Sequence, residues 1–342
     1  MGHYQTQLKS LGLVSGLLLS IVLALICGPV DITLAQIWHL LWHLPQSQNT
    51  ADWYIFVDIR LPRILLALLV GGALGCAGAV LQGLLRNPLA DPGLIGVSSG
   101  AALFASLTIL LGASWLHGYF NMIGIWAVPA AGLLGGFGAV LILYAFATKK
   151  GETSVATIIL GGIAISAFAG ALTGLIVSMA NDQTLRSITF WSLGSLAGAS
   201  WQALVAFLPF ALLGGSCLLG LPHGLNALQL GEAEAQMMGA QVEKIKRRAL
   251  FSAACLTGAA VALSGMIGFV GLLVPHLARL SFSADYRMVL PISAVLGAIL
   301  LLLADTLARS LIAPAELPVG VVTALLGAPC LFWLLLKKPG LL

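Results

Sequence analysis

Three arginines near the ends of apolar segments are the side chains best suited to chemistry in this sequence. Arg60 and Arg63 stand three positions apart around Pro62, which places both on one face of a helix. Arg309 ends a later apolar run, one turn after Asp305. A guanidinium group binds a carboxylate through two parallel hydrogen bonds, so these arginines could receive acidic groups from a partner or a substrate. The plainer alternative is that they anchor the chain at a membrane interface.

Other ionisable residues are scarce within the apolar segments. Asp305 and His276 are the only candidates there, and both lie near segment ends. Ion-driven transporters usually carry such a group inside the membrane, so we expect the driving force to come from elsewhere. His39 and His43 are four apart, as metal ligands can be, but the tryptophans beside them favour a helix lying on the outer membrane surface. The five cysteines have no paired spacing, and we predict no metal site and no catalytic residue.

The elements that carry these residues are unusually apolar. Of 342 residues, 59% are hydrophobic, and only 16 are basic and 12 acidic. Soluble domains are roughly 25% charged, whereas a bilayer core takes about 20 apolar residues per helix. We therefore predict an all-α polytopic membrane protein, one transmembrane domain over residues 1–342, with about ten transmembrane helices and short interfacial and coupling helices. The predicted spans are Leu11–Val30, Ile64–Leu85, Leu94–Leu111, Ile125–Thr148, Val155–Met179, Ala203–Leu221, Ala249–Ile267, Phe269–Ser281, Leu290–Leu307 and Val319–Leu336.

Two alternatives to ten spans exist. The first span could be a cleaved signal peptide, but its length favours a retained helix. The seventh and eighth could form one long helix, but basic residues collect on the cytoplasmic side of membrane proteins, and nine spans would erase that bias. With ten spans and both termini inside, 12 basic residues lie inside and 4 outside. The inner set is Lys9, Arg86, Lys149, Lys150, Lys244, Lys246, Arg247, Arg248, Arg279, Arg287, Lys337 and Lys338, and the outer set is Arg60, Arg63, Arg186 and Arg309.

The longest predicted cytoplasmic segment, about residues 222–248, indicates a docking element. Its pattern from Leu225 to Met238 predicts a pair of short helices, with Met237 and Met238 forming an apolar patch. An amphipathic element facing the cytosol is typical of a docking site for a soluble partner, although a solvated surface helix is the alternative. The chain has no Gly-x-x-x-x-Gly-Lys-Ser/Thr motif, so ATP hydrolysis would have to occur on a separate subunit.

Two further loops are distinctive. The stretch from Arg86 to Gly93 contains two prolines and a glycine, which predicts an ordered turn at the inner surface. On the outer side, Arg186 precedes Trp191 in a polar and aromatic stretch that could border a substrate entrance.

Several segments, taken in order, resemble the ten-span permease subunits of type II ABC importers for iron chelates, heme and cobalamin, a FecCD-like family. The resemblance covers nearly the whole chain. It is carried by Asp58–Arg63 (DIRLPR), Gly78–Gln82 (GAVLQ), Asn87–Gly96 (NPLADPGLIG), Gly265–His276 (GMIGFVGLLVPH) and Glu316–Thr323 (ELPVGVVT).

The resemblance implies a set of partners and site residues. It implies a homodimer in the bacterial inner membrane with the path at the dimer interface, two ATP-binding subunits that hold ATP-Mg, and a periplasmic substrate-binding protein. No directly bound cofactor and no nucleic acid are expected. The matching positions are Arg60, Arg63 and Arg309 for binding-protein docking; Leu230, Gly231, Glu232, Ala233, Met237, Met238 and Gly239 for coupling to the ATPase; and Asn87, Leu89, Thr153 and Ser154 for the cytoplasmic gate.

The substrate is less specified. The segment Thr189–Leu196 is more similar to heme and ferric-siderophore permeases than to cobalamin ones, and Arg186, with Trp191 beside the entrance, could attract heme propionates. We therefore expect an importer of heme first, a ferric siderophore close behind, and cobalamin third. An ion-coupled secondary transporter and an intramembrane enzyme are the rival classes. The first would need Asp305 as a coupling residue, and the second would need a buried nucleophile and base.

Overall fold

The chain is built almost entirely of helices in a computed structural model, which describes residues 2–30, 33–42, 50–113 and 124–337. The predicted all-α class is confirmed, and each predicted span falls largely within a helix. Within the described residues, six helices are long and apolar enough to cross a membrane, so the number of ten crossings stays a prediction. The helices that match the spans are α1 (Gly2–Ile26), α5 (Leu61–Leu85), α6 (Val97–Ala113), α8 (Ala127–Ala147), α9 (Val155–Met179), α11 (Trp201–Leu218), α14 (Val242–Ser264), α15 (Val270–Ser281), α16 (Tyr286–Ser310) and α17 (Val319–Lys337).

Short elements lie at the ends of these long helices. They are α2 (Leu34–Trp42), α4 (Ala51–Tyr54), the π-helical η1 (Ile55–Arg60), the 3₁₀ turns η2 (Pro92–Ile95) and η3 (Gly124–Trp126), the strands β1 (Thr148–Lys149) and β2 (Glu152–Thr153), α10 (Asp182–Ser192), α12 (Leu221–Leu228) and α13 (Glu232–Met237).

The seventh and eighth predicted spans are separate helices, so the alternative of one long helix is wrong. The backbone of Gly265 has φ +68°, which ends α14, and α15 begins five residues later at Val270. A side chain at Gly265 would place its Cβ 2.1 Å from the carbonyl oxygen of Trp191. Glycine is therefore needed both for the turn and for the close approach of α10.

Helix α5 forms the centre of the fold. It is buried along most of its length and packs against α14, α15 and α16. Its glycines allow this, because a Cβ on Gly71, Gly75 or Gly78 would lie 1.8–2.3 Å from a backbone oxygen of α15 or α16. Small residues at such positions let helix backbones touch where no hydrophobic force drives helices together.

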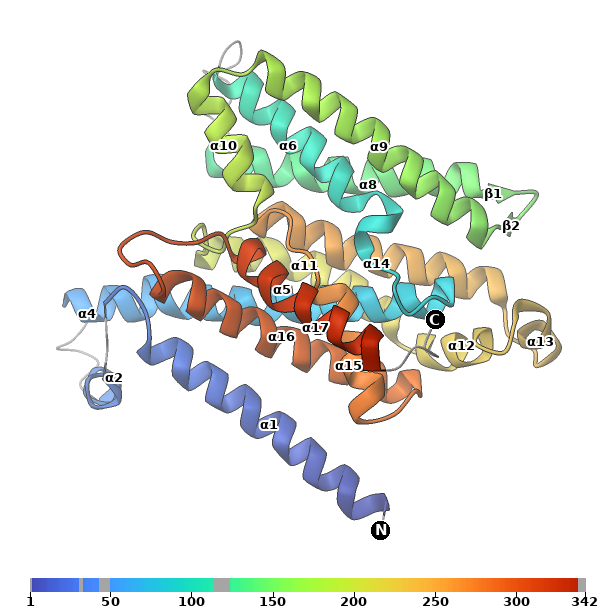
Figure 1. Cartoon of the computed structure of the whole chain (residues 1–342), viewed down its shortest axis with the longest axis horizontal. Coiled ribbons are helices and arrows are strands. Elements are labelled where there is room, and N and C mark those ends of the chain that lie inside the picture. The colour runs from blue at the N-terminus through green and yellow to red at the C-terminus, as the bar shows by residue number, and fades with distance from the viewer. Residues whose placement is uncertain (1, 31–32, 43–49, 114–123, 338–342) are drawn as a thin grey trace.

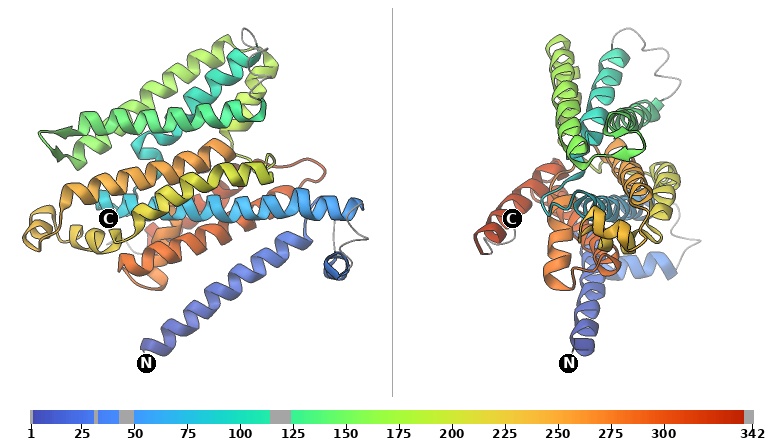
Figure 2. Two further views of the ribbon diagram at one scale, coloured as in Figure 1. Left: turned by 180° about the vertical axis from the view of Figure 1, so that it is seen from behind. Right: turned by 90° about the vertical axis from the view of Figure 1, so that its right-hand side faces the viewer.

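The helices form two groups with functional elements at opposite ends. One group holds α6, α8 and α9, the other α5, α11, α15 and α16, and α14 contacts both (Figures 1 and 2). Helices α4 and α10 lie at one end of the molecule, whereas β1, β2 and α13 lie at the other (Figure 1). The candidate residues fall at these two ends.

Candidate functional site

A two-stranded hairpin positions the predicted gate residues Thr153 and Ser154. Strands β1 and β2 pair antiparallel, and the two residues between them, Lys150 and Gly151, have positive φ angles of 53° and 84°. Two such residues form the tight turn that matches the twist of paired strands. Ser154 follows directly and caps α9, its hydroxyl oxygen accepting from the backbone N–H of Thr157 at 3.2 Å.

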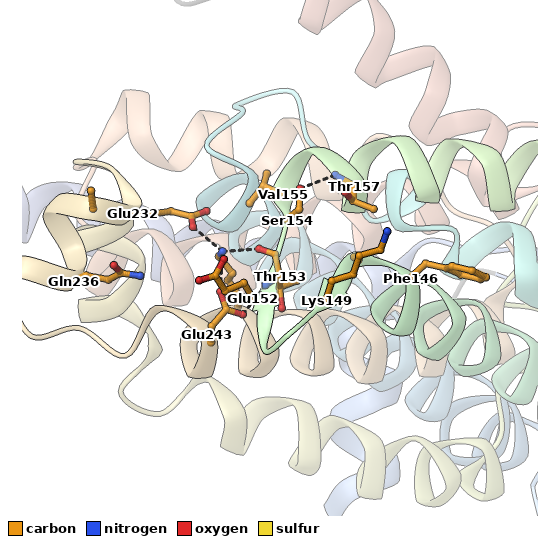
Figure 3. A pocket seen from close by; sticks show the side chains of 13 residues that line it. Phe146, Lys149, Glu152, Thr153, Ser154, Val155, Thr157, Glu232, Gln236 and Glu243 are labelled. Atoms are coloured by element: carbon orange, nitrogen blue, oxygen red, sulfur yellow. Dashed lines mark hydrogen bonds and ion pairs between the residues drawn. The ribbon is translucent and has the colours of Figure 1, made fainter.

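A cavity of about 730 Å³ separates this hairpin from α13 (Figure 3). It brings Thr153 and Ser154 together with Glu232 and Ala233, two of the residues predicted to couple the chain to an ATPase. Its lining carries both charge signs, and it is formed by Phe146, Ala147, Lys149, Glu152, Thr153, Ser154, Val155, Thr157, Glu232, Ala233, Gln236, Glu243 and Lys246.

Lys246 lies between the two predicted sites, and sequence reasoning did not single it out. Its side chain is only 2% exposed. The ammonium group donates to the carbonyl oxygen of Thr153 at 2.6 Å, to Glu232 Oε2 at 2.7 Å and to Glu243 Oε1 at 3.0 Å. An ammonium group has three protons, so each proton has a partner.

Glu243 completes the contact between α14 and the hairpin. Its Oε2 accepts from the backbone N–H of Thr153 at 2.9 Å, while its Oε1 faces Lys246. Burial raises the pKa of Glu243, but hydrogen bonds from Thr153 and the charge of Lys246 outweigh it, so the pKa is lowered. The carboxylate is therefore ionised at neutral pH. The only sequence signal for this pair is the three-residue spacing of Glu243 and Lys246 on one helix face.

The predicted pair of short helices is present as α12 and α13, and their cytoplasmic placement stays a prediction. The turn between them holds Leu230 and Gly231, and Gly239 follows α13; both glycines have positive φ angles. Leu230 is 63% exposed, Met237 81% and Met238 67%. Three large apolar side chains are thus presented outward at this end, as a docking surface requires.

The other two predicted gate residues lie in the turn after α5. Asn87 Oδ1 accepts from the backbone N–H of Leu89 at 2.9 Å, and both residues are half-buried. Asp91 caps η2 by accepting from the N–H of Gly93, and burial raises its pKa. Neither Asn87 nor Leu89 lines the cavity beside Thr153. The predicted ordered turn is confirmed, whereas a joint constriction with Thr153 stays a prediction.

At the opposite end, two of the three predicted docking arginines bind the C-terminus of α1. Arg60 donates to the carbonyl oxygens of Leu25, Ile26 and Val30, and Arg309 donates to that of Ala24. The last carbonyls of a helix have no partner within the helix, and cations are favourable there. These guanidinium groups therefore cap α1.

The third arginine, Arg63, is bound by two carboxylates. It donates to both oxygens of Asp305 at 2.9–3.1 Å and to both oxygens of Glu316 at 2.9 and 3.0 Å. Asp305 is 1% exposed and also lies 3.8 Å from Arg309. Arg60, Arg63 and Arg309 are only 2%, 6% and 3% exposed, because their own chain supplies the acceptors, and their role in binding-protein docking stays a prediction.

The two predicted entrance residues, Arg186 and Trp191, differ in their surroundings. Arg186 is exposed on α10, whereas Trp191 is half-buried and its ring packs near Gly132 of α8. A separate cavity of about 380 Å³ lies beside the end of α10 and is lined by Ser192, Leu193, Met266, Gly320, Val321, Ala324 and Leu325. Among the described residues, no group of three His, Cys, Asp or Glu side chains is placed to hold a metal ion, and His43 lies outside the described residues.

Comparisons with known proteins agree with this architecture. The family model described as the FecCD transport family matches residues 16–337. The hemin transport system permease protein of Yersinia pestis is 45% identical over 332 residues, covering 95% of this chain and 96% of that protein. The cobalamin import system permease protein of Halobacterium salinarum is 40% identical over 304 residues, covering 89% and 78%. A solved structure of a metal-chelate type ABC transporter, in an inward-facing conformation, has a TM-score of 0.83 and 36% identity, covering 96% of this chain and 98% of that one.

Proposed function

Because the chain belongs to the FecCD transport family and is the permease subunit of a type II ABC importer, we propose that its cargo is heme. The 45% identity to a hemin permease over almost the whole of both chains carries this proposal. Arg186, exposed on α10, adds a positive charge that could bind heme propionates. A ferric siderophore is the second candidate and cobalamin the third, since a cobalamin permease is 40% identical.

The chain itself moves the cargo, while ATP-Mg is hydrolysed on separate subunits. We propose that two such subunits dock on a homodimer of this permease, each at the surface formed by Leu230, Gly231, Glu232, Ala233, Met237, Met238 and Gly239. The exposed apolar side chains there support this, because they need cover from a partner. Thr153 and Ser154, with Asn87 and Leu89, form the proposed gate above it.

The second copy of the permease has a candidate contact surface on α9. Leu160 and Phe168 are each 68% exposed on this helix, and Met179 is 75% exposed. These exposed apolar side chains could contact either lipid or a second copy of the permease. If the cargo passes between two copies, we expect them to contact the second copy.

A periplasmic binding protein is the proposed partner at the arginine end. Its acidic residues would reach Arg63 most easily, by replacing Glu316, whose side chain is 31% exposed, rather than Asp305 at 1%. Arg60 and Arg309 would contribute indirectly, by holding the C-terminal end of α1 in place. In this arrangement both termini are cytoplasmic and the chain lies in the inner membrane.

Reconstitution tests the function. The permease, its ATP-binding subunit and its binding protein are placed in lipid vesicles, and ATP hydrolysis and uptake are measured with hemin, a ferric siderophore and cobalamin in turn. We expect hemin to give the largest stimulation and no uphill uptake by the permease alone. Stimulation by another chelate would replace heme as cargo, and accumulation by the lone permease under an ion gradient would establish the ion-coupled alternative.

A further inference from the structure

We propose that Lys246 is a positioning residue that transmits movement of α13 to the gate at the start of α9. This inference rests on the proposed function and adds the residue that links the ATPase surface to the gate. Its basis is one buried ammonium group on α14 that contacts two other elements, at Thr153 on β2 and Glu232 on α13, as well as Glu243 on its own helix.

The burial of Lys246 makes its connection between α13 and the hairpin costly to break. The side chain is 2% exposed, whereas Glu232 and Glu243 are 36% and 35% exposed. Removal of one partner from a buried charge is strongly destabilising. Lys246 therefore cannot release Glu232 at low cost, and a displacement of α13 either moves the ammonium group or breaks the pair.

On the side away from α13, Lys246 is connected to the proposed gate through the backbone of Thr153. Lys246 holds the carbonyl oxygen of Thr153, and Glu243 holds its N–H, so both backbone groups of this residue are bound to α14. The Thr153 hydroxyl lies 3.0 Å from that of Thr148 across the hairpin. Ser154, the next residue, caps the N-terminus of α9. A shift of Lys246 is thus passed to the first turn of α9.

The position of Glu232 makes α13 the source of the movement. Glu232 is the first residue of this helix, and the exposed Met237 and Met238 lie at its other end. Figure 3 shows Glu232 reaching from α13 toward Thr153, with Glu243 on the α14 side. A partner that pushes on the methionines therefore acts on a helix whose opposite end is bound to Lys246.

The test measures coupling rather than assembly. The permease with its ATP-binding subunit and binding protein is reconstituted as wild type and as Glu232→Gln, Lys246→Met and Lys246→Arg, with Lys244→Met as the matched control. Lys244 is an exposed lysine two residues earlier on the same helix. We measure the number of ATP molecules hydrolysed per chelate imported, after checking by pull-down that the ATP-binding subunit is still bound.

We expect Glu232→Gln to raise this ratio about tenfold, the effect of losing one charge-assisted hydrogen bond between Lys246 and α13. Lys246→Met removes all three hydrogen bonds of the ammonium group and should raise the ratio at least as much. Lys246→Arg should restore part of the coupling, and Lys244→Met should match the wild type. Glu232→Gln keeps the test valid if Lys246→Met does not fold, because Glu232 is partly exposed. Unchanged ratios in assembled Glu232→Gln complexes, with wild-type import intact, would overturn this inference alone. A wild type that imports no chelate would overturn the proposed function and the inference with it.

Discussion

Arg63 on α5 and Asp305 on α16 are joined by three hydrogen bonds, although 242 positions separate them in the chain. The pair joins the ends of two helices that pack against each other along the centre of the fold. Both side chains are buried, so the value of the pair is best measured by the loss of one member.

Asp305→Asn should destabilise the protein by about 3–5 kcal/mol, because it leaves Arg63 and Arg309 without their shared buried carboxylate. The thermal midpoint in detergent measures this, with exposed Asp182→Asn as the control. A variant with the wild-type midpoint but no transport would contradict the structural role and favour Asp305 as an ion-coupling residue.

Glu316→Gln should strengthen binding of the substrate-binding protein, whereas Arg63→Gln should weaken it. The first change removes a competing carboxylate from Arg63, and the second removes the guanidinium group itself. Affinity measured at low salt, where such charges are least screened, checks both. Equal affinities for all three proteins would exclude Arg63 from the docking site.

Gly78→Ala should cost about 1–3 kcal/mol, as overpacking of a tight contact does. Its Cβ would lie 1.8 Å from the carbonyl oxygen of Gly271, so α5 and α15 would have to separate. Gly138→Ala is the matched control, because a Cβ on Gly138 meets no atom within 4 Å. Similar thermal midpoints for the two variants would show that the α5–α15 contact can relax freely.

Met237→Glu combined with Met238→Glu should release the ATP-binding subunit. The change places two charges where 81% and 67% exposed apolar side chains would be covered by the partner. The double leucine variant keeps the apolar surface and should retain the subunit in a pull-down. A glutamate variant that still co-purifies with the ATPase would move the docking surface elsewhere.

Acid should weaken the contact between α14 and the hairpin. The lowered pKa of Glu243 means that the folded protein binds its proton less tightly than the unfolded chain, whose glutamates titrate at about pH 4.3. The stabilisation is therefore present above that value and is lost as the pH falls through the lower folded pKa. Thermal midpoints of wild type and Glu243→Gln should differ at neutral pH and converge in acid. A difference that stays constant into that range would contradict the assignment.

Sequence patterns predicted most of the long helices because apolar length alone defines them. Helix α9 begins and ends at Val155 and Met179, as predicted. Helix α14 begins at Val242 rather than at the predicted Ala249, because its first two turns are charged and lie beyond the apolar segment. Apolar length marks the span within a helix and not the polar extension of that helix.

The sites were less predictable because they depend on contacts between distant segments. One basic stretch contains Lys244, Lys246, Arg247 and Arg248, and its sequence does not show which of them is buried. Lys246 is buried because the hairpin packs against α14 and brings Thr153, 93 positions away in the chain, into contact with it. Likewise, the spacing of Arg60 and Arg63 predicts a shared helix face. It does not reveal that α1, Asp305 and Glu316 cover that face.

The shortness of the hairpin restricts how the passage can open. Only Lys150 and Gly151 join its two strands, and the N–H of Ser154 donates to the carbonyl oxygen of Ala147 at 3.0 Å. The short hairpin therefore holds the end of α8 and the beginning of α9 close together. Opening of the proposed gate would have to move the end of α8 and the beginning of α9 together.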